Sequence, residues 1–202
     1  MKSDLCLTKR TVWFKMIENI QEVAGEVFMM NETIQTLLTR RSIRSFRPEA
    51  IPQSTMESLI QAAKFAPTAM GLQDRHFTIV NDAKILDHIV EVAVKNGATF
   101  LKGHTPFYHA PSVVVVSAPE NSRYGRENVA CAIENLMLAA KALGLGTCYI
   151  CSVLPGLQDE VIRKELKLPE NYIPYGCVSV GYPAEEAPEP KPRRTDDVTI
   201  LP

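Results

Sequence analysis

The 202-residue chain has no excess of either charge and no long apolar run. Its 22 basic and 23 acidic side chains leave a formal net charge of -1, so no overall basic field would attract nucleic acid. No apolar stretch approaches the roughly 20 residues that a membrane helix needs. With 46% hydrophobic and 22% charged residues, the composition predicts a soluble globular protein of one domain with a short appendage.

The five cysteines are too few and too irregularly spaced for a disulfide framework. An odd count, in a chain that is long enough to fold around its own core, predicts reduced thiols and a cytoplasmic protein. Cys148 and Cys151 have C-x-x-C spacing, but no second pair completes a zinc site. A three-residue step along a strand also sends the two thiols to opposite faces. We expect neither a metal site nor a disulfide here.

Two glycine motifs that bind nucleotides are also missing. Gly144 and Gly146 lack the third glycine of a dinucleotide fingerprint, and they follow a predicted helix rather than a strand. The phosphate-loop pattern G-x-x-x-x-G-K-[ST] does not occur. The four histidines form no i,i+4 pair and no recognisable triad, so the sequence predicts no catalytic side chain.

Residues 1–30 carry an amphipathic helical pattern. Apolar residues recur there at spacings of three and four: Trp13, Met16, Ile17, Ile20, Val23 and Val27. Glu18, Glu22 and Glu26 interrupt any continuous apolar segment, which argues against a signal peptide. We predict a helical extension that packs on the body of the protein or on a partner subunit. A membrane-surface anchor is the weaker alternative, because such a helix usually carries Lys and Arg on its polar face.

From residue 31 onward, helices and strands are intermixed. Asn31 is expected to cap a short helix, and Ser54-Thr-Met-Glu57 has the pattern of a capping box. The remaining patterns predict strands at 76–80, 112–117, 147–151 and 176–180, and helices after Asp82, at 127–143 and at 157–166. Prolines 183, 188, 190 and 192 predict an extended C-terminal arm. This order predicts an α+β fold with helices on both faces of one sheet.

The predicted helix at 127–143 has almost no polar face. Val129, Ile133, Leu136 and Ala140 follow helical spacing, and most residues between them are also apolar. A helix that is apolar nearly all round is buried, either in a core or between subunits. Gly144 is its expected C-terminal cap.

The densest group of candidate functional residues is Arg40, Arg41, Ser42 and Arg44. A phosphate monoester carries nearly two negative charges, and the planar fork of arginine meets its oxygens in a bidentate way. A second basic group, Lys191, Arg193 and Arg194, lies on the proline-rich arm. From spacing alone, a solvated basic turn is slightly favoured for the first group, and the second group alone would also be a surface run.

Four blocks in order make the chain resemble the FMN-dependent nitroreductase family. They are RRSIRSF at 40–46, APTA at 66–69 with Gln73, ALGLG at 142–146 before a strand, and Lys191-Pro-Arg193 before Val198. The similarity runs from about residue 31 to the C-terminus and leaves residues 1–30 outside. We therefore divide the chain into an N-terminal helical extension, 1–30, and a nitroreductase-like FMN-binding domain, 31–202.

The resemblance implies a fold and an assembly. The family fold is an α+β three-layer α/β/α sandwich with a central, mainly antiparallel sheet. Its members form intertwined homodimers with two FMN sites at the subunit interface. In this chain, the helix at 127–143 would then be an interface helix.

The resemblance also implies which residues bind the cofactor. Residues that match the family's phosphate, ribityl and pyrimidine contacts are Arg40, Arg41, Ser42, Arg44, Lys191 and Arg193. Pro67, Thr68 and Ala69 match contacts from the other subunit, and Gln73 is retained from the same block. Cys151 and Ser152 match the strand end whose backbone N–H faces flavin N5. No catalytic side chain is implied, because the flavin carries the chemistry.

The activity that the resemblance implies is electron transfer from NAD(P)H to nitroaromatic, quinone or related small acceptors by a ping-pong mechanism. Alternatives within the fold are dehalogenation, dehydrogenation or simple flavin storage. The chain departs from the family at Gly71, Asp74 and Arg75, where many members have Asn-x-Gln-Pro-Trp. We expect this departure to affect substrate preference more than FMN binding, through a more open and more polar pocket mouth.

Overall fold

The computed structural model describes residues 31–101 and 103–201, which divide after Leu38 into two units. The described part of the first unit, residues 31–38, holds helix α2 (Glu32–Thr39) except for its last residue, and the helix buries none of its residues. Asn31 caps it as predicted, since its Oδ1 accepts a hydrogen bond from Ile34 N at 2.9 Å. The prediction of a helical extension over 1–30 lies outside the described residues.

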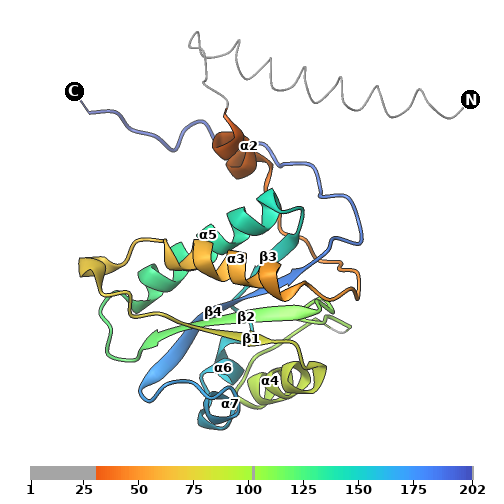
Figure 1. The fold of residues 1–202 in the computed structure, drawn as a ribbon, viewed down its shortest axis with the longest axis vertical. Helices are drawn as coiled ribbons and strands as arrows, with labels where there is room; N and C mark the ends of the chain where they lie inside the picture. Colours follow the sequence, from red (N-terminus) through yellow and green to blue (C-terminus); the bar gives the residue numbers. More distant parts are fainter. Residues whose placement is uncertain (1–30, 102, 202) are drawn as a thin grey trace, which may run out of the picture. The chain divides into compact units, whose positions relative to one another are not determined.

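The second unit is built on one antiparallel sheet (Figure 1). Its strands are β1 (His76–Val80), β2 (Ser112–Pro119), β3 (Gly146–Ile150) and β4 (Tyr172–Gly181), in the spatial order β1-β2-β4-β3. All residues of β2 from Ser112 to Ala118 are buried, as a β-branched run predicts for a central strand. The two edge strands are therefore β1 and β3.

Helices cover both faces of this sheet, and the predicted α+β class is confirmed (Figure 1). Val114 and Val116 of β2 share a core with α3 (Gln53–Lys64) and α5 (Gly125–Ala142). Val113 and Val115, which point the other way, share a second core with α4 (Ala83–Lys95), α6 (Leu154–Leu157) and α7 (Glu160–Glu165). Among the described helices, none is long and apolar enough to cross a membrane.

Helix α5 is buried on one face by its own chain. It packs against α3 and against β2, β3 and β4, and its buried residues include Val129, Ile133 and Leu136. The core alternative therefore accounts for this face, while Ala130 and Cys131 are exposed and the interface role of the helix stays a prediction. Gly144 follows the helix with φ +76°, the left-handed conformation expected of a C-terminal glycine.

One local prediction was wrong, and another had wrong bounds. The Ser54–Glu57 capping box does not form: α3 begins at Gln53 after Pro52, and Glu57 Oε1 instead accepts from Gln53 Nε2 at 2.8 Å. The helix predicted at 157–166 is the shorter α7, which begins after Asp159, whose Oδ1 accepts from Val161 N at 2.9 Å, while α6 ends at Leu157.

The C-terminal arm leaves the sheet beside residues 40–47, which are called the arginine segment below. Arg47 N donates to Tyr182 O at 2.9 Å, and Ala184 N donates to Ser45 O at 3.0 Å. Residues 185–201 then form neither helix nor strand and are almost entirely exposed. The four prolines predicted this extended course.

Candidate functional site

The arginine segment occupies the open edge of β3. Ile43 N donates to Thr147 O at 2.9 Å, and Ser42 forms a parallel bridge with Thr147. Ile43 packs directly on Gly146, where a Cβ would lie only 2.8 Å from Ile43 Cγ1. An edge strand offers unpaired backbone groups, and this segment uses them. The sheet edge thus fixes where the flanking arginines lie.

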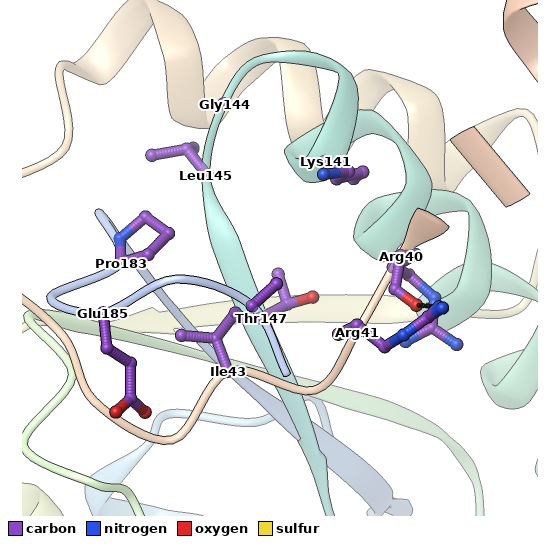
Figure 2. A pocket seen from close by; sticks show the side chains of 10 residues that line it. Arg40, Arg41, Ile43, Lys141, Gly144, Leu145, Thr147, Pro183 and Glu185 are labelled. Atoms are coloured by element: carbon purple, nitrogen blue, oxygen red, sulfur yellow. Dashed lines mark hydrogen bonds between the residues drawn. The ribbon is translucent and has the colours of Figure 1, made fainter. Parts of the chain in front are cut away.

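Arg40 and Arg41 line a pocket of about 170 Å³. Figure 2 shows the side chains of Arg40 and Arg41 close together and that of Lys141 on the last turn of α5. Arg41 Nη1 donates to Arg40 O at 2.6 Å, and Arg40 Nε lies 3.4 Å from Glu134 Oε1. Three cationic side chains from two segments therefore face one small space.

The C-terminal arm brings a further cation to the same place. Burial lowers the pKa of the Arg41 guanidinium, and the charges of Arg193 and Arg40 lower it further, against a smaller opposing effect of Glu189. Arg193 and Arg40 thus repel the Arg41 charge, and an anion bound here would relieve this repulsion. Arg41 and Arg193, 152 positions apart in the printed sequence, thus share one electrostatic site. Lys191 lies two residues earlier on the same exposed arm.

The second predicted block, residues 67–73, lies elsewhere. It forms the short 3₁₀ turn η1 (Ala69–Gly71) and leads directly into β1. Thr68 Oγ1 accepts from Gln73 N at 3.0 Å, and Ala69 N donates to Oδ1 of Asn128, near the start of α5, at 2.9 Å. Gln73 and Pro67 are exposed.

Within one chain the two groups of predicted residues do not meet. The arginine segment borders β3 and the 67–73 loop borders β1, which are separated by three strand spacings, about 14 Å in all. They also contact opposite ends of α5, since Lys141 lies about 20 Å along the helix axis from Asn128. One protomer thus carries two separate halves of the predicted site.

Comparison with known proteins relates both the sequence and the fold of this chain to one family. The sequence profile described as the nitroreductase family matches residues 37–182. The crystal structure of a nitroreductase with bound FMN from Bacteroides fragilis superimposes with a TM-score of 0.77 at 30% identity, covering 85% of this chain and 100% of that one.

The chain belongs to the nitroreductase family.

Named relatives of this nitroreductase-family chain have different activities. The FMN reductase (NAD(P)H) of Bacillus subtilis is 29% identical over 178 residues, covering 81% of this chain and 70% of the relative. The iodotyrosine deiodinase of Haliscomenobacter hydrossis is also 29% identical, over 198 residues, covering 84% of this chain and 87% of the relative. The arm with Lys191 and Arg193 lies beyond the residues that match the family profile.

Arg44 is positioned by a strained turn that the sequence did not reveal. Its guanidinium lies 6.0 Å from the centroid of the Tyr108 ring, which the His104 ring meets edge-on at 5.4 Å. Tyr108 and His109 both have positive φ, 55° and 54°, which is costly for residues with a side chain. Ser179 Oγ donates to Phe107 O at 3.0 Å and holds the turn in place.

Cys148 in β3 and Cys151 just after it lie on opposite sides of the sheet. Cys148 belongs to the core beneath α4, and its burial raises the pKa of its thiol, an effect that the nearby Arg44 charge partly offsets. Cys151 is exposed just after the strand and lies beside Tyr149, whose pKa is raised to about 12, first by burial and then by Cys151. Ser152 is exposed next to it. Both predicted flavin-facing residues thus stand at the free end of β3.

Sequence reasoning missed Lys141 and Tyr108. A lysine in the last turn of a helix is common, because it complements the helix dipole, so nothing in its spacing marked Lys141 as a pocket residue. The contact of Tyr108 with Arg44 joins segments 64 positions apart, and no local pattern encodes it.

Proposed function

We propose that this chain is an FMN-dependent oxidoreductase that uses NAD(P)H to reduce nitroaromatic, quinone or related small acceptors, with FMN held between two subunits. Membership of the nitroreductase family supports the oxidoreductase class and the cofactor. The observation that carries the two-subunit site is the separation of its halves. A single protomer presents the arginines at one sheet edge and the 67–73 loop at the other.

The residues at the β3 edge fit the phosphate end of FMN. The charges of Arg40 and Arg193 repel that of Arg41, although Glu134 and Glu185 lie nearby. A terminal phosphate would offset this repulsion, and each arginine can bind two of its oxygens. Ser42, Arg44 and Lys191 complete the set that would hold the phosphate, ribityl chain and pyrimidine.

The other half of each site comes, in this proposal, from the second subunit. The flavin ring would be covered by four residues of that subunit, Pro67, Thr68, Ala69 and Gln73. Cys151 and Ser152, at the end of β3, would face the ring with their backbone N–H groups. Loop 67–73 is largely exposed in the protomer, as a surface that waits for a second copy should be. The chain would therefore act as a homodimer.

Bound FMN supplies the two-electron chemistry of the reaction. The side chains of the chain bind and orient: the arginines fix the charged end, and the loop limits access to the ring. We assign no acid or base to any side chain and name no catalytic residue. Because one pocket would serve the donor and the acceptor in turn, we expect ping-pong kinetics.

The deiodinase relative gives a specific second candidate, reductive removal of halogen from an aromatic ring. One set of measurements separates the possibilities. Denatured purified protein should release FMN, identified by chromatography. Under argon, its yellow colour should bleach with NADH or NADPH and return with a nitroaromatic or a quinone. Return of colour with iodotyrosine alone would favour the deiodinase, and absence of FMN would refute the whole proposal.

A further inference from the structure

A buried asparagine joins α5 to the loop at 67–75. Asn128 is 3% exposed, and its Oδ1 accepts from Ala69 N at 2.9 Å. Its Nδ2 donates to Asp74 Oδ1 at 2.9 Å, while Asp74 Oδ2 accepts from Ser122 Oγ at 3.1 Å. A buried amide whose oxygen and nitrogen both have partners has one fixed orientation. Asn128 thereby holds the loop at two points, before and after its tightest turn.

Arg75 ties the same loop to α3. Its Nη2 donates to Ala66 O at 2.9 Å and to Lys64 O at 3.1 Å, the carbonyls that end α3. Its Nη1 lies 3.5 Å from the backbone oxygen of Asn128. Burial lowers the pKa of Arg75, against an opposing effect of the Asp74 charge. Asp74 and Arg75 are thus engaged with α3 and α5, and the expectation of a more open and more polar pocket mouth stays a prediction.

The anchored part of the loop has a strained backbone. Met70 and Gln73 have φ of 55° and 51°, and both carry side chains that disfavour this region. Such strain persists only where the surroundings over-determine the conformation. The turn presents Met70 and Leu72 outward, with 82% and 56% of their surface exposed. Both side chains line a cavity of about 360 Å³ together with Asp74 and Asn128.

We infer that Asn128 is a positioning residue, which fixes loop 67–73 and so sets the fit of the electron acceptor. The inference rests on the proposed function, because it is the bound FMN of the dimer that this loop would face. The effect of Asn128 is transmitted through its hydrogen bonds to Ala69 and Asp74.

The test replaces Asn128 and a matched asparagine on the same helix. Asn135 lies two turns further along α5, and its Nδ2 donates to Ala62 O of α3 at 3.1 Å, away from the loop. Asn128→Leu removes both side-chain hydrogen bonds to the loop, and it should raise the acceptor KM about tenfold with kcat changed less than about twofold. Asn135→Leu should leave both constants near wild type.

Hydrogen exchange of the cofactor-free chain gives a readout apart from activity. The backbone amides of residues 69–73 should exchange faster than in the wild type when Asn128 is replaced by Leu. Their exchange rates should not change when Asn135 is replaced by Leu. Should Asn128→Leu fail to fold, Asp74→Ala removes the second anchor without altering α5, and the same loop-specific change is expected. If the wild type binds no FMN, the proposed function fails. The exchange experiment still tests whether Asn128 holds loop 67–73, because it uses the cofactor-free chain. Equal behaviour of the 128 and 135 variants, with FMN bound, overturns the inference.

Discussion

At the scale of the residue, the arginines at the β3 edge are expected to bind FMN through charge-assisted hydrogen bonds. Arg44→Ala and Arg193→Ala should each weaken FMN binding about tenfold or more, because each removes a charge-assisted bond worth roughly 1.5–3 kcal/mol. Titration of the cofactor-free protein with FMN measures this loss. Arg47→Ala is the matched control, since Arg47 lies over the Tyr182 ring at 5.0 Å and beside Glu49. An unchanged FMN affinity in both test variants would show that Arg44 and Arg193 are solvated surface residues.

Gly71 shows how a single dihedral angle changes a prediction. The structure gives it φ +64°, with no atom within 4 Å of an added Cβ. Asparagine tolerates this conformation better than most residues, so Gly71→Asn should fold with a stability loss of about 1 kcal/mol. We expect it to change the acceptor kcat/KM and to leave FMN affinity within about twofold.

The control for this substitution is Gly71→Val, whose branched side chain cannot adopt positive φ without strain. Thermal unfolding should show a clearly larger loss for valine than for asparagine. A Gly71→Asn protein that loses FMN but keeps its acceptor profile would mean that this turn belongs to the cofactor rather than to the acceptor.

At the scale of the element, the course of β3 keeps apart two cysteines that have C-x-x-C spacing in the sequence. Replacing Cys148 and Cys151 by serine should leave NAD(P)H-driven bleaching of the flavin intact, since the thiols lie on opposite faces of the strand. Cys148→Ser should cost about 1–3 kcal/mol, because it buries a hydroxyl in an apolar core, and Cys151→Ser should cost little. Stopped-flow reduction and denaturant titration measure the two effects. A double variant that binds FMN but cannot be reduced would reveal a working dithiol.

Periodicity and capping chemistry predicted most of the elements. The β-branched run of β2, the Asp82 cap of α4 and the proline arm all follow from local sequence. The errors arise where a distant contact decides. Gly156 of α6 lies against α4 so closely that a Cβ would be 2.3 Å from Ile89 O, a constraint that periodicity at 157–166 cannot contain.

The candidate site was predicted in part, and for the same reason. The resemblance supplied the arginine blocks, but the roles of Asn128 and Tyr108 depend on contacts across 59 and 64 positions of the chain. On sequence grounds Asn128 is a polar residue in an apolar helix. Only the fold shows that it is buried and bonded to the loop at 67–75.

For the whole molecule, the two-subunit site predicts its own oligomeric state. Light scattering at micromolar concentration should give about twice the 22.5 kDa mass of the chain. FMN should remain bound only in that form. A monomer that carries FMN stoichiometrically would contradict the proposal, because one protomer would then have to unite halves that lie at opposite sheet edges.

Mixing two defective subunits tests the shared site directly. Arg41→Ala disables the half at the β3 edge, and Pro67→Glu places a carboxylate on the exposed loop of the other half. Each homodimer should bind FMN poorly. In a mixed dimer, one site receives both altered halves and the other receives neither. Random reassociation should therefore restore binding to about a quarter of the sites, measured as flavin retained after gel filtration. If both halves came from one subunit, every site would keep one defect and mixing would restore nothing.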